Sequence, residues 1–295
     1  MSAGTVLITG YNGFTGKYAA ELLRERGFKA VGLVHEKGSG TDEYSCDLTD
    51  KARVLECVQA IKPQYVLHLA ALAFVGHSDE KEFYNVNVFG TLNLLDALYA
   101  SRVEPEKVLI ASSANIYGTP ANIETIDESV NPSPVNHYAM SKLAMEYMTR
   151  TWFEKLPIVI VRPFNYTGAG QDERFLVPKI VNHFKRREEV IELGNLDVFR
   201  DFSDVRDVVR AYGDLLVSRA ESEVFNVCSG RAYALREIID WAGEIAGYKI
   251  EVRTNPAFVR SNEIPRLKGD NSKLVKYISY QPMYSFADTI RSMFE

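Results

Sequence analysis

The sequence has few cysteines and no long apolar segment. Its 295 residues include three cysteines, Cys46, Cys57 and Cys228. An odd number at irregular spacing suits neither a disulfide framework nor a zinc site, so we expect reduced thiols, a cytoplasmic protein and no bound metal. The longest apolar run, YVLHLAALAFVG from Tyr65, is shorter than the ~20 residues that span a bilayer. The N-terminal MSAGTVLITG lacks the basic and apolar regions of a signal peptide, so we expect no membrane or targeting segment.

An excess of basic residues is also missing. The chain has 34 Lys and Arg against 39 Asp and Glu, a formal net charge of −5. Non-specific nucleic-acid binding needs a basic face, so we expect no nucleic-acid partner. The cluster at residues 185–188 is too short and too mixed to change this, and it is typical of a solvated helix surface.

The first two-thirds of the chain alternates short apolar runs with longer helical patterns. Near-continuous apolar runs, typical of parallel strands covered on both faces, occur at TVLITG, KAVGLV, YVLHLAA, VLIASS and IVIVRPF. Helical patterns of crossover length lie between them, at residues 16–26, 50–62, 84–102 and 138–155. The sequence therefore predicts an α/β protein with a doubly wound parallel Rossmann sheet.

The pattern changes after Asn165, where loops, helices and short strands mix. The helical pattern DFSDVRDVVRAYGDLLV and the strand EVFNVCSG could both return to the first domain. We therefore predict an NAD(P)-binding Rossmann domain of residues 1–165 and 201–230. A smaller, discontinuous α/β substrate-binding lobe of residues 166–200 and 231–295 would lie over the carboxyl ends of the strands, where such sheets bind ligands.

A glycine triplet, GYNGFTG, lies between the first strand and the first helix. Without side chains at Gly10, Gly13 and Gly16, the backbone can approach a pyrophosphate that the helix N-terminus stabilises. The same triplet also occurs in βα turns that only pack. Its place after the first strand of a βαβ unit favours dinucleotide binding.

The end of the second strand bears on the choice of cofactor. Val34 stands where an acid would bind the adenosine ribose of NAD. His35, Lys37 and Ser39 suit a 2′-phosphate, whereas Glu36 could still serve NAD. We expect NADPH or NADH, with a preference for NADP(H).

The segment Tyr138-Ala-Met-Ser-Lys142 places a phenol and an ammonium four residues apart. Such residues share one helix face, and a nearby cation favours ionisation of a phenol. Tyr138 is thus a candidate proton donor to a carbonyl, with Lys142 assisting. The pair also occurs by chance on helix surfaces, but Ser113 at the end of the preceding strand and the glycine triplet argue against coincidence.

Together GYNGFTG, CDLTD, HLAA, ASSANIYG and YAMSK resemble the extended short-chain dehydrogenase/reductase family, whose members modify nucleotide sugars. The segments 85–95, 162–171, 193–212 and 259–270 extend the resemblance, and the last three are similar to the GDP-mannose branch of dehydratases and reductases. This resemblance implies a GDP-sugar substrate. It also implies a homodimer through a four-helix bundle of helices 84–102 and 138–155, although their apolar residues would equally suit packing within one chain.

The resemblance also assigns residues to roles. The catalytic residues are Ser113, Tyr138 and Lys142. The cofactor-binding residues are Gly10, Asn12, Gly13, Phe14, Gly16, His35, Asp47, Leu48, Leu69, Ala70, Ala71, Asn87, Tyr138 and Lys142. The substrate-binding residues are Asn115, Asn165, Arg200, Arg260 and Glu263. A guanidinium fork suits a diphosphate, and the alternative for each arginine is a surface salt bridge.

The sequence departs from the family pattern at three places. Asn136-His137 replaces the usual Ser-Pro before the tyrosine, and RSNE stands in place of Arg-Pro-x-Glu. Dehydratases of this branch carry Glu or Asp-Glu directly after the active-site Ser/Thr, where this chain has Ala114 and Asn115. Elimination needs an acid–base group, and an asparagine amide has no useful pKa.

The remaining groups suffice for hydride transfer. We expect reduction of the C4 ketone of GDP-4-keto-6-deoxy-D-mannose by NAD(P)H to GDP-D-rhamnose or GDP-6-deoxy-talose, with Tyr138 as proton donor. The alternatives are a nucleotide-sugar 4-epimerase with retained NAD, then a 4,6-dehydratase or a non-catalytic NADP sensor. Asn115 disfavours the dehydratase, and the intact Tyr138–Lys142 pair disfavours the sensor.

Overall fold

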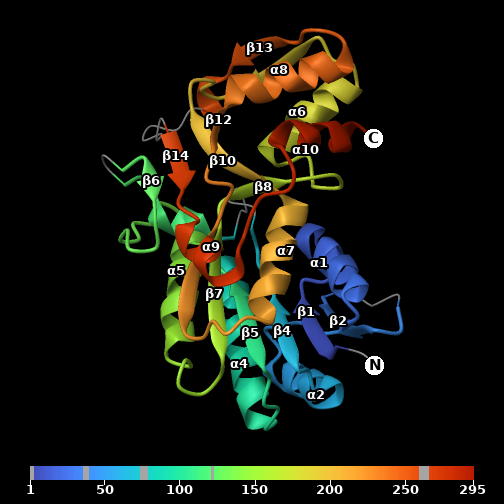
Figure 1. Ribbon diagram of the computed structural model, residues 1–295, viewed down its shortest axis with the longest axis vertical. Coiled ribbons are helices and arrows are strands. Elements are labelled where there is room, and N and C mark those ends of the chain that lie inside the picture. Colours follow the sequence, from blue (N-terminus) through green and yellow to red (C-terminus); the bar gives the residue numbers. More distant parts are fainter. Residues whose placement is uncertain (1–2, 36–39, 74–78, 121–122, 259–265) are drawn as a thin grey trace.

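The computed structural model describes residues 3–35, 40–73, 79–120, 123–258 and 266–295. Figure 1 shows a lower part built around one sheet and an upper part that carries α6, α8 and α10. The two parts meet above the carboxyl ends of the lower strands.

The lower part contains a seven-stranded sheet in the order β11-β7-β5-β4-β1-β2-β3. Its strands are β1 (Thr5–Thr9), β2 (Lys29–Val34), β3 (Glu43–Ser45), β4 (Tyr65–His68), β5 (Lys107–Ala111), β7 (Ile158–Pro163) and β11 (Glu223–Val227). All neighbouring strands are parallel. The order reverses between β1 and β4, the position at which doubly wound sheets bind ligands. The predicted Rossmann sheet is confirmed.

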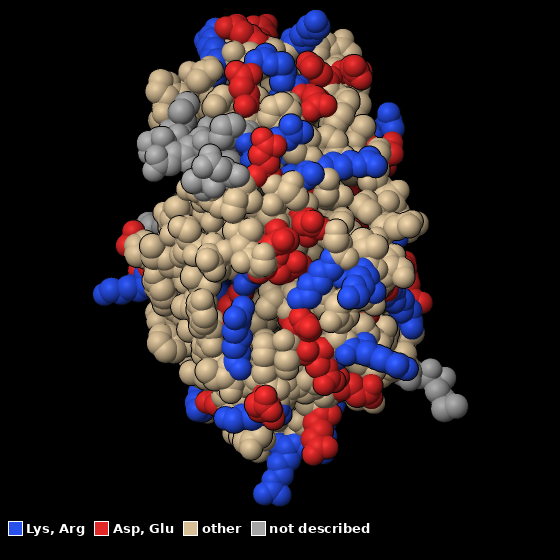
Figure 2. Space-filling model, turned by 60° about the vertical axis from the view of Figure 1, so that its left-hand side comes forward, with Lys and Arg blue, Asp and Glu red and all other residues tan. Residues whose placement is uncertain are grey.

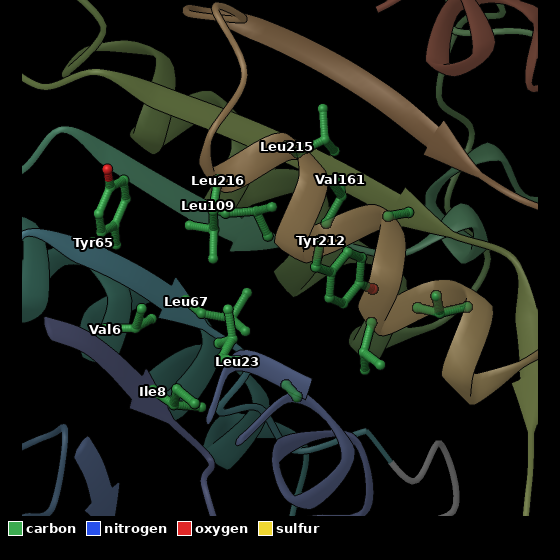
Figure 3. Close-up of a cluster of buried hydrophobic side chains, with 14 of the residues drawn as sticks. Val6, Ile8, Leu23, Tyr65, Leu67, Leu109, Val161, Tyr212, Leu215 and Leu216 are labelled. Carbon is green, nitrogen blue, oxygen red and sulfur yellow. The ribbon is translucent and has the colours of Figure 1, made fainter. Parts of the chain in front are cut away.

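Helices cover both faces of this sheet. One face carries α1 (Phe14–Glu25), α7 (Val205–Leu216) and α9 (Ser272–Ile278), and the other carries α2 (Lys51–Ile61), α4 (Thr91–Ala100) and α5 (His137–Arg150). Figure 3 shows Val6, Leu67 and Leu109 of neighbouring strands facing Tyr212 and Leu215 of α7. The alternate residues Leu7, Val66 and Ile110 of the same strands face the opposite helices, so both faces need apolar residues, as the sequence pattern predicted.

The helix predicted at residues 84–102 begins four residues earlier in the structure and is divided into three segments. These are α3 (Glu80–Tyr84), the π-helical η1 (Asn85–Gly90) and α4. The wide π turn directs Asn87 inward, where its amide bonds both backbone groups of Leu72. At the same turn a Cβ on Gly90 would lie 3.1 Å from the Leu48 Cβ, so the glycine allows a close approach. Periodicity predicted the helix but not this local widening, which depends on tertiary contacts.

The upper part has its own sheets and core. One sheet contains β6 (Thr125–Ile126), β8 (Asn165–Thr167), β10 (Phe199–Asp204), β12 (Ala232–Ala234) and β14 (Arg266–Gly269), and β9 (Val190–Leu193) pairs with β13 (Glu251–Thr254). The helices α6 (Leu176–Lys185), α8 (Leu235–Ala246) and α10 (Phe286–Phe294) pack around a separate apolar cluster. Two short 3₁₀ helices, η2 (Ala114–Tyr117) and η3 (Pro256–Phe258), complete the described elements.

Four of the described elements cross the predicted domain division, and two of them, β8 and β10, straddle its boundaries after residues 165 and 200. β6 lies within residues 1–165 but pairs with β14 of the upper sheet. Conversely, Leu274 of α9 lies in the core of the Rossmann part although residues 231–295 were expected in the lobe. The two parts therefore exchange short segments.

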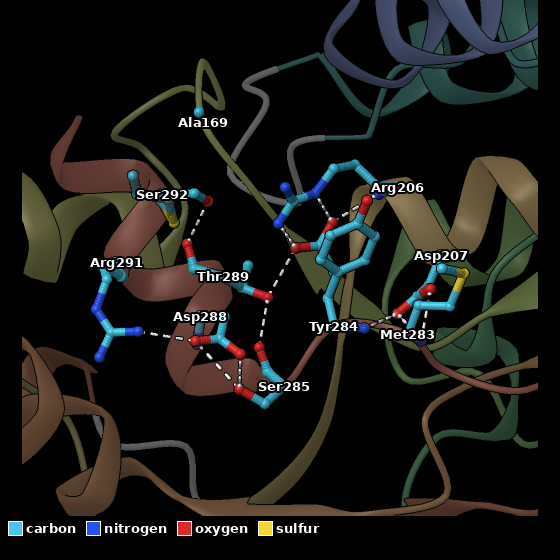
Figure 4. Close-up of polar contacts among 12 residues, drawn as sticks. Ala169, Arg206, Asp207, Met283, Tyr284, Ser285, Asp288, Thr289, Arg291 and Ser292 are labelled. Atoms are coloured by element: carbon cyan, nitrogen blue, oxygen red, sulfur yellow. Dashed lines mark hydrogen bonds and ion pairs between the residues drawn. The ribbon is translucent and has the colours of Figure 1, made fainter.

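The C-terminal segment fastens the upper part to α7. Figure 4 shows Thr289 of α10 beside the start of α7, where its hydroxyl bonds the Asp204 carboxylate at 2.8 Å. The Met283 amide donates to Asp207 at 2.9 Å, and the Arg206 guanidinium lies 3.7 Å from the Tyr284 ring centroid. These contacts hold the two parts in a fixed arrangement around the carboxyl edge of the sheet.

Acidic and basic side chains are interspersed on the face drawn in Figure 2. In the described part of the chain, no helix combines the length and the hydrophobicity required to cross a bilayer. Nor do the described residues bring together three or more His, Cys, Asp or Glu side chains in a group suited to a metal ion.

Candidate active site

The glycine turn closes tightly on the end of β4. Gly10 has a φ of +69°, and a Cβ there would lie 2.9 Å from both the nitrogen and the Cα of Ala70. A Cβ on Gly16 would lie 2.3 Å from the Gly10 carbonyl oxygen. Gly13 is the N-cap of α1, so the first amides of this helix lie at the turn. The turn is a cradle that side chains would fill, and it fits a pyrophosphate. Asn12 is exposed beside it.

The loop after β4 forms the next wall of this groove. The backbone amides of Leu69 and Ala70 each donate to the Thr9 hydroxyl oxygen at 3.1 Å, and Ala71 follows half-buried. Thr9 and Thr91 contact opposite nitrogens of the buried His68 ring at 2.7 and 2.8 Å. Burial lowers the pKa of His68 to about 3, so the ring is neutral at physiological pH. Polar residues in an apolar strand were the sequence signal for this network, and the sequence interpretation missed it.

The residues expected to contact adenosine lie beyond β2 and β3. Asp47 accepts hydrogen bonds from the amide and hydroxyl of Thr49 at 2.9 and 2.8 Å, and these bonds lower the pKa of its carboxyl group. The exposed His35 ring lies 3.8 Å from the Asp47 carboxylate, and Leu48 is buried next to it. The expectations for Glu36, Lys37 and Ser39 fall outside the described residues.

The three predicted catalytic side chains are brought to the carboxyl edge of the sheet. Ser113 follows β5 and is 7% exposed, while Tyr138 and Lys142 lie in α5 and are 8% and 2% exposed. Ser113 and Tyr138 share a hydrogen bond, which partly offsets the rise in the pKa of Tyr138 to about 12 that burial causes. The Lys142 ammonium donates to the Ala111 carbonyl at 2.7 Å. Burial lowers the pKa of Lys142 to about 8, and Glu146 acts against that shift.

The start of α5 accounts for the Asn136-His137 departure. The Asn136 side chain caps the helix by accepting from the Ala139 amide at 2.8 Å. Asparagine is a favoured N-cap residue. His137 contacts Tyr84 at 3.0 Å and Glu80 at 3.1 Å. The pair therefore fixes the start of the catalytic helix against α3.

The predicted substrate residues line the junction of the two parts. Asn115 is exposed in the first turn of η2, and its amide nitrogen donates to the Ser113 hydroxyl oxygen at 3.1 Å. Asn165 is exposed at the start of β8, and its side chain donates to the Asp201 carbonyl at 3.2 Å. The half-buried Arg200 donates to the Phe199 carbonyl at 2.8 Å. Arg260 and Glu263 lie outside the described residues.

Asn87 has a structural role that its predicted cofactor contact did not anticipate. Its side-chain oxygen accepts from the Leu72 amide at 2.9 Å, and its nitrogen donates to the Leu72 carbonyl and the Ser141 hydroxyl. Asn87 therefore links the groove wall to the catalytic helix. Contact with the cofactor stays a prediction.

Phe14 and a further residue, Tyr166, lie between the glycine turn and Tyr138. The Tyr166 hydroxyl contacts the Thr15 hydroxyl at 2.9 Å, and its ring stacks on Phe14 with centroids 6.3 Å apart. Tyr166 also acts to raise the pKa of Tyr138. The sequence gives no signal for Tyr166, because it stands at no fixed spacing from the glycine triplet or from Tyr138.

Comparison with known proteins identifies the family. Residues 7–293 match the family model described as GDP-mannose 4,6 dehydratase. A GDP-6-deoxy-D-talose 4-dehydrogenase of Aggregatibacter actinomycetemcomitans is 40% identical, with 92% of this chain and 90% of the relative covered. A GDP-6-deoxy-D-mannose reductase of Pseudomonas aeruginosa is 34% identical, with 78% and 79% covered. The solved structure of RMD from Pseudomonas aeruginosa complexed with NADPH has a TM-score of 0.89 and 29% identity, with 99% of this chain and 98% of that chain covered.

The chain belongs to the GDP-mannose 4,6-dehydratase family. Both the resemblance read from the sequence and the expected α/β fold are confirmed. The expected class, an NAD(P)-dependent enzyme of nucleotide-sugar metabolism, is confirmed as well.

Proposed function

We propose that this enzyme reduces the C4 ketone of GDP-4-keto-6-deoxy-D-mannose with NADPH or NADH. The product is GDP-D-rhamnose or GDP-6-deoxy-talose. The observation that carries the proposal is a complete Ser113, Tyr138 and Lys142 constellation in which Ala114 and Asn115 follow the serine. Those two residues offer no acid–base group for elimination, so the site retains redox chemistry alone. The names of the two curated relatives, a 4-dehydrogenase and a reductase of GDP-6-deoxyhexoses, support the same chemistry.

The groove fits a dinucleotide on structural grounds. Its pyrophosphate would lie on the Gly10–Gly16 turn, and the opposite ends of the groove would receive adenosine at Asp47 and nicotinamide near Tyr138. The bound cofactor would supply the hydride to sugar C4. NADP(H) remains the preferred form, because Val34 takes the place of the ribose-binding acid of NAD.

Side chains of this enzyme would stabilise the C4 oxygen and supply its proton. Ser113 donates a hydrogen bond to the C4 oxygen, and Tyr138 gives its proton to the alkoxide that develops there. A buried phenol whose pKa is about 12 holds its proton until such a base forms. Lys142, still mainly cationic at neutral pH, favours the phenolate that remains and can hold a ribose hydroxyl of the cofactor.

The upper part would hold the nucleotide diphosphate. Arg200 lies at the junction and is the described candidate for a diphosphate contact, with Arg260 and Glu263 as further candidates from the resemblance. A guanidinium offers paired donors that match phosphate oxygens. Asn165 and Asn115 would contact the sugar.

We further propose a homodimer in the cytoplasm. The outer surface of the helices α4 and α5 and of η1 presents the exposed apolar side chains Phe89, Tyr99, Met140 and Tyr147. Exposed aromatic groups on adjoining helices suit a four-helix contact between two copies. The three cysteines are buried thiols without a disulfide, which suits a reducing compartment.

The decisive experiment supplies purified protein with GDP-4-keto-6-deoxy-D-mannose and NADPH or, separately, NADH. Stoichiometric cofactor oxidation and a GDP-6-deoxyhexose identified by NMR are expected, and the rate ratio reports the cofactor preference. The Tyr138→Phe variant is the control for chemistry at this site. No consumption of either cofactor would contradict the reductase. Release of tightly bound NAD on denaturation would then favour a 4-epimerase.

A further inference from the structure

A buried ion pair lies directly behind the catalytic helix. Glu146 of α5 and Arg162 of β7 are 1% and 2% exposed. Arg162 Nη2 donates to Glu146 Oε2 at 2.7 Å, and Arg162 Nε donates to Glu146 Oε1 at 3.0 Å. This two-pronged contact fixes the orientation of the carboxylate as well as its distance.

The arginine is itself held from other elements. Arg162 Nη1 donates to the Tyr117 hydroxyl at 2.8 Å, and that hydroxyl donates to the Asn226 side-chain oxygen at 2.7 Å. Asn226 then donates to the Ile126 carbonyl at 3.0 Å. Elements η2, β6, β7 and β11 therefore keep Arg162 in place, and Glu146 cannot turn away from it without leaving buried groups unpaired.

The position of Glu146 on the helix connects this pair to the site. Tyr138, Lys142 and Glu146 follow one another at intervals of four residues, so they share one face of α5. Lys142 is held at its other side by the Ala111 carbonyl. Along the helix, Lys142 therefore stands one turn from the phenol and one turn from the fixed carboxylate, on the face that they share.

Charged and titratable groups of three elements, α5, β4 and β7, surround Lys142. From α5 the Glu146 carboxylate acts on it, and from β4 it acts on His68, which is neutral at physiological pH. Arg162 of β7 stands behind Glu146. Burial alone lowers the pKa of Lys142, whereas the Glu146 carboxylate raises it. Glu146 is the anion that offsets the burial of this cation.

A purely structural role for the pair is the alternative. Buried ion pairs contribute little net stability, because desolvation opposes their attraction, and apolar residues often replace them without loss. A structural pair would nevertheless account for the hydrogen bonds described above. The two roles differ in one measurable respect, which is whether the charge of Glu146 acts on Lys142.

We propose that Glu146 and Arg162 are positioning residues of the active site. Glu146 keeps Lys142 protonated beneath the cofactor. Arg162 fixes the orientation of the Glu146 carboxylate and partly neutralises its effect on Lys142. The part of this inference that concerns catalysis rests on the proposed reductase function. The part that concerns the charge of Lys142 does not depend on the sugar substrate.

Removing the anion and removing the cation should shift the pH dependence of activity in opposite directions. Glu146→Gln removes the anion and leaves the Arg162 cation, so Lys142 loses its proton more readily. The decline of activity at high pH, the alkaline limb of the pH profile, therefore moves to lower pH. Arg162→Gln leaves the carboxylate unneutralised, so the same limb moves to higher pH. We expect shifts of about one pH unit in each direction, since charges this close interact on that scale. The double variant Glu146→Gln with Arg162→Gln keeps the net charge and should lie between them.

Tyr117→Phe is the matched control, because it breaks the network around Arg162 without changing a charge. Its effect on stability is measured by thermal unfolding, and it should leave the position of the alkaline limb unmoved.

Two readouts are needed, the pH profile of kcat/KM for the ketosugar and the pH profile of NADPH affinity from nucleotide fluorescence without sugar. Opposite shifts of the two single variants in either profile support the proposal. If Arg162→Gln does not fold, the proposal is supported when the alkaline limb of Glu146→Gln lies at a lower pH than the alkaline limb of the double variant. Limbs that stay in place, or that move together with Tyr117→Phe, overturn it. Shifted NADPH profiles without sugar reduction would retain this inference and reject the proposed function, whereas active variants with unmoved limbs would do the reverse.

Discussion

Alanine substitution of two glycines separates the backbone strain of the glycine turn from its effect on the cofactor groove. Gly10 and Gly27 both have left-handed φ values, +69° and +83°. An L residue in this region costs roughly 1–2 kcal/mol, so Gly27→Ala should lower the free energy of unfolding by about that amount and Gly10→Ala by at least as much. For a chain of this size this corresponds to a fall in Tm of about 2–4 °C per kcal/mol.

The two sites differ in what the new methyl group meets. A Cβ on Gly27 has no heavy atom within 4 Å, whereas a Cβ on Gly10 would lie 2.9 Å from the nitrogen and Cα of Ala70. These are backbone atoms, and the Ala70 amide is also bonded to Thr9, so the groove wall has to move. Such a shift displaces the pyrophosphate cradle. We expect Gly10→Ala to weaken NADPH binding at least tenfold, about 1.4 kcal/mol, and Gly27→Ala to leave it within about twofold.

The assay combines thermal unfolding with a fluorescence titration of NADPH. Loss of stability in both variants, with loss of NADPH affinity in Gly10→Ala alone, would support the predicted geometry. If Gly10→Ala bound NADPH as tightly as Gly27→Ala, the close approach of the glycine turn to Ala70 would not shape the cofactor site.

Three further predictions concern single side chains. Tyr138→Phe should lower kcat for ketone reduction by about 10²–10⁴-fold and keep the affinity for NADPH, because only the proton donor is lost. An unchanged kcat in stopped-flow kinetics would exclude Tyr138 as the donor. Asn115→Ala should lower kcat/KM for the ketosugar by about tenfold, the value of one hydrogen bond, without affecting the KM for NADPH. Equal effects on kcat/KM for the ketosugar and on KM for NADPH would place Asn115 at the cofactor instead. The pKa of His68 falls from about 6.5 in the unfolded chain to about 3 in the fold, so the unfolded state binds the extra proton and stability is lost as pH falls below about 6.5. Between pH 6.5 and 5.5 this loss is about 1 kcal/mol, so in chemical denaturation the free energy of unfolding should fall by about that much more in the wild type than in His68→Gln, whose amide can still contact Thr9 and Thr91.

The central sheet was predictable because its strands are buried on both faces. Val108, Leu109 and Ile110 face opposite helix layers in turn, so the strand requires a continuous apolar run that is visible without any partner. The pairing of β6 with β14 was not predictable. Each is short, the two lie far apart in the chain, and register between them depends on contacts that no local pattern encodes.

The site shows the same division between local and tertiary information. Tyr138 and Lys142 are neighbours by helical spacing alone, so the sequence predicted their relation. Ser113 joins them because β5 ends beside the start of α5, which follows from the Rossmann connection. Arg162 and Glu146 could not be paired from the sequence, since charged residues in a buried strand and a helix have many potential partners. Only the packing of α5 against β7 selects this one.

Contacts of α1 with β8 and with the loop after it connect the two proposed ligand sites. The Tyr18 hydroxyl donates to the Ala169 carbonyl at 2.9 Å, and Thr15 contacts Tyr166 at 2.9 Å. The N-terminus of α1 is the proposed pyrophosphate site, whereas β8 begins with Asn165, the proposed sugar contact. A displacement of α1 would therefore also move the backbone that carries Asn165. Hydride transfer requires the reacting carbons to approach within about 3–3.5 Å, and a direct connection between donor and acceptor sites limits the error in that distance. If the proposed sites are right, the hydroxyl contact of Thr15 with Tyr166 would let the first turn of α1 position both the pyrophosphate and the sugar.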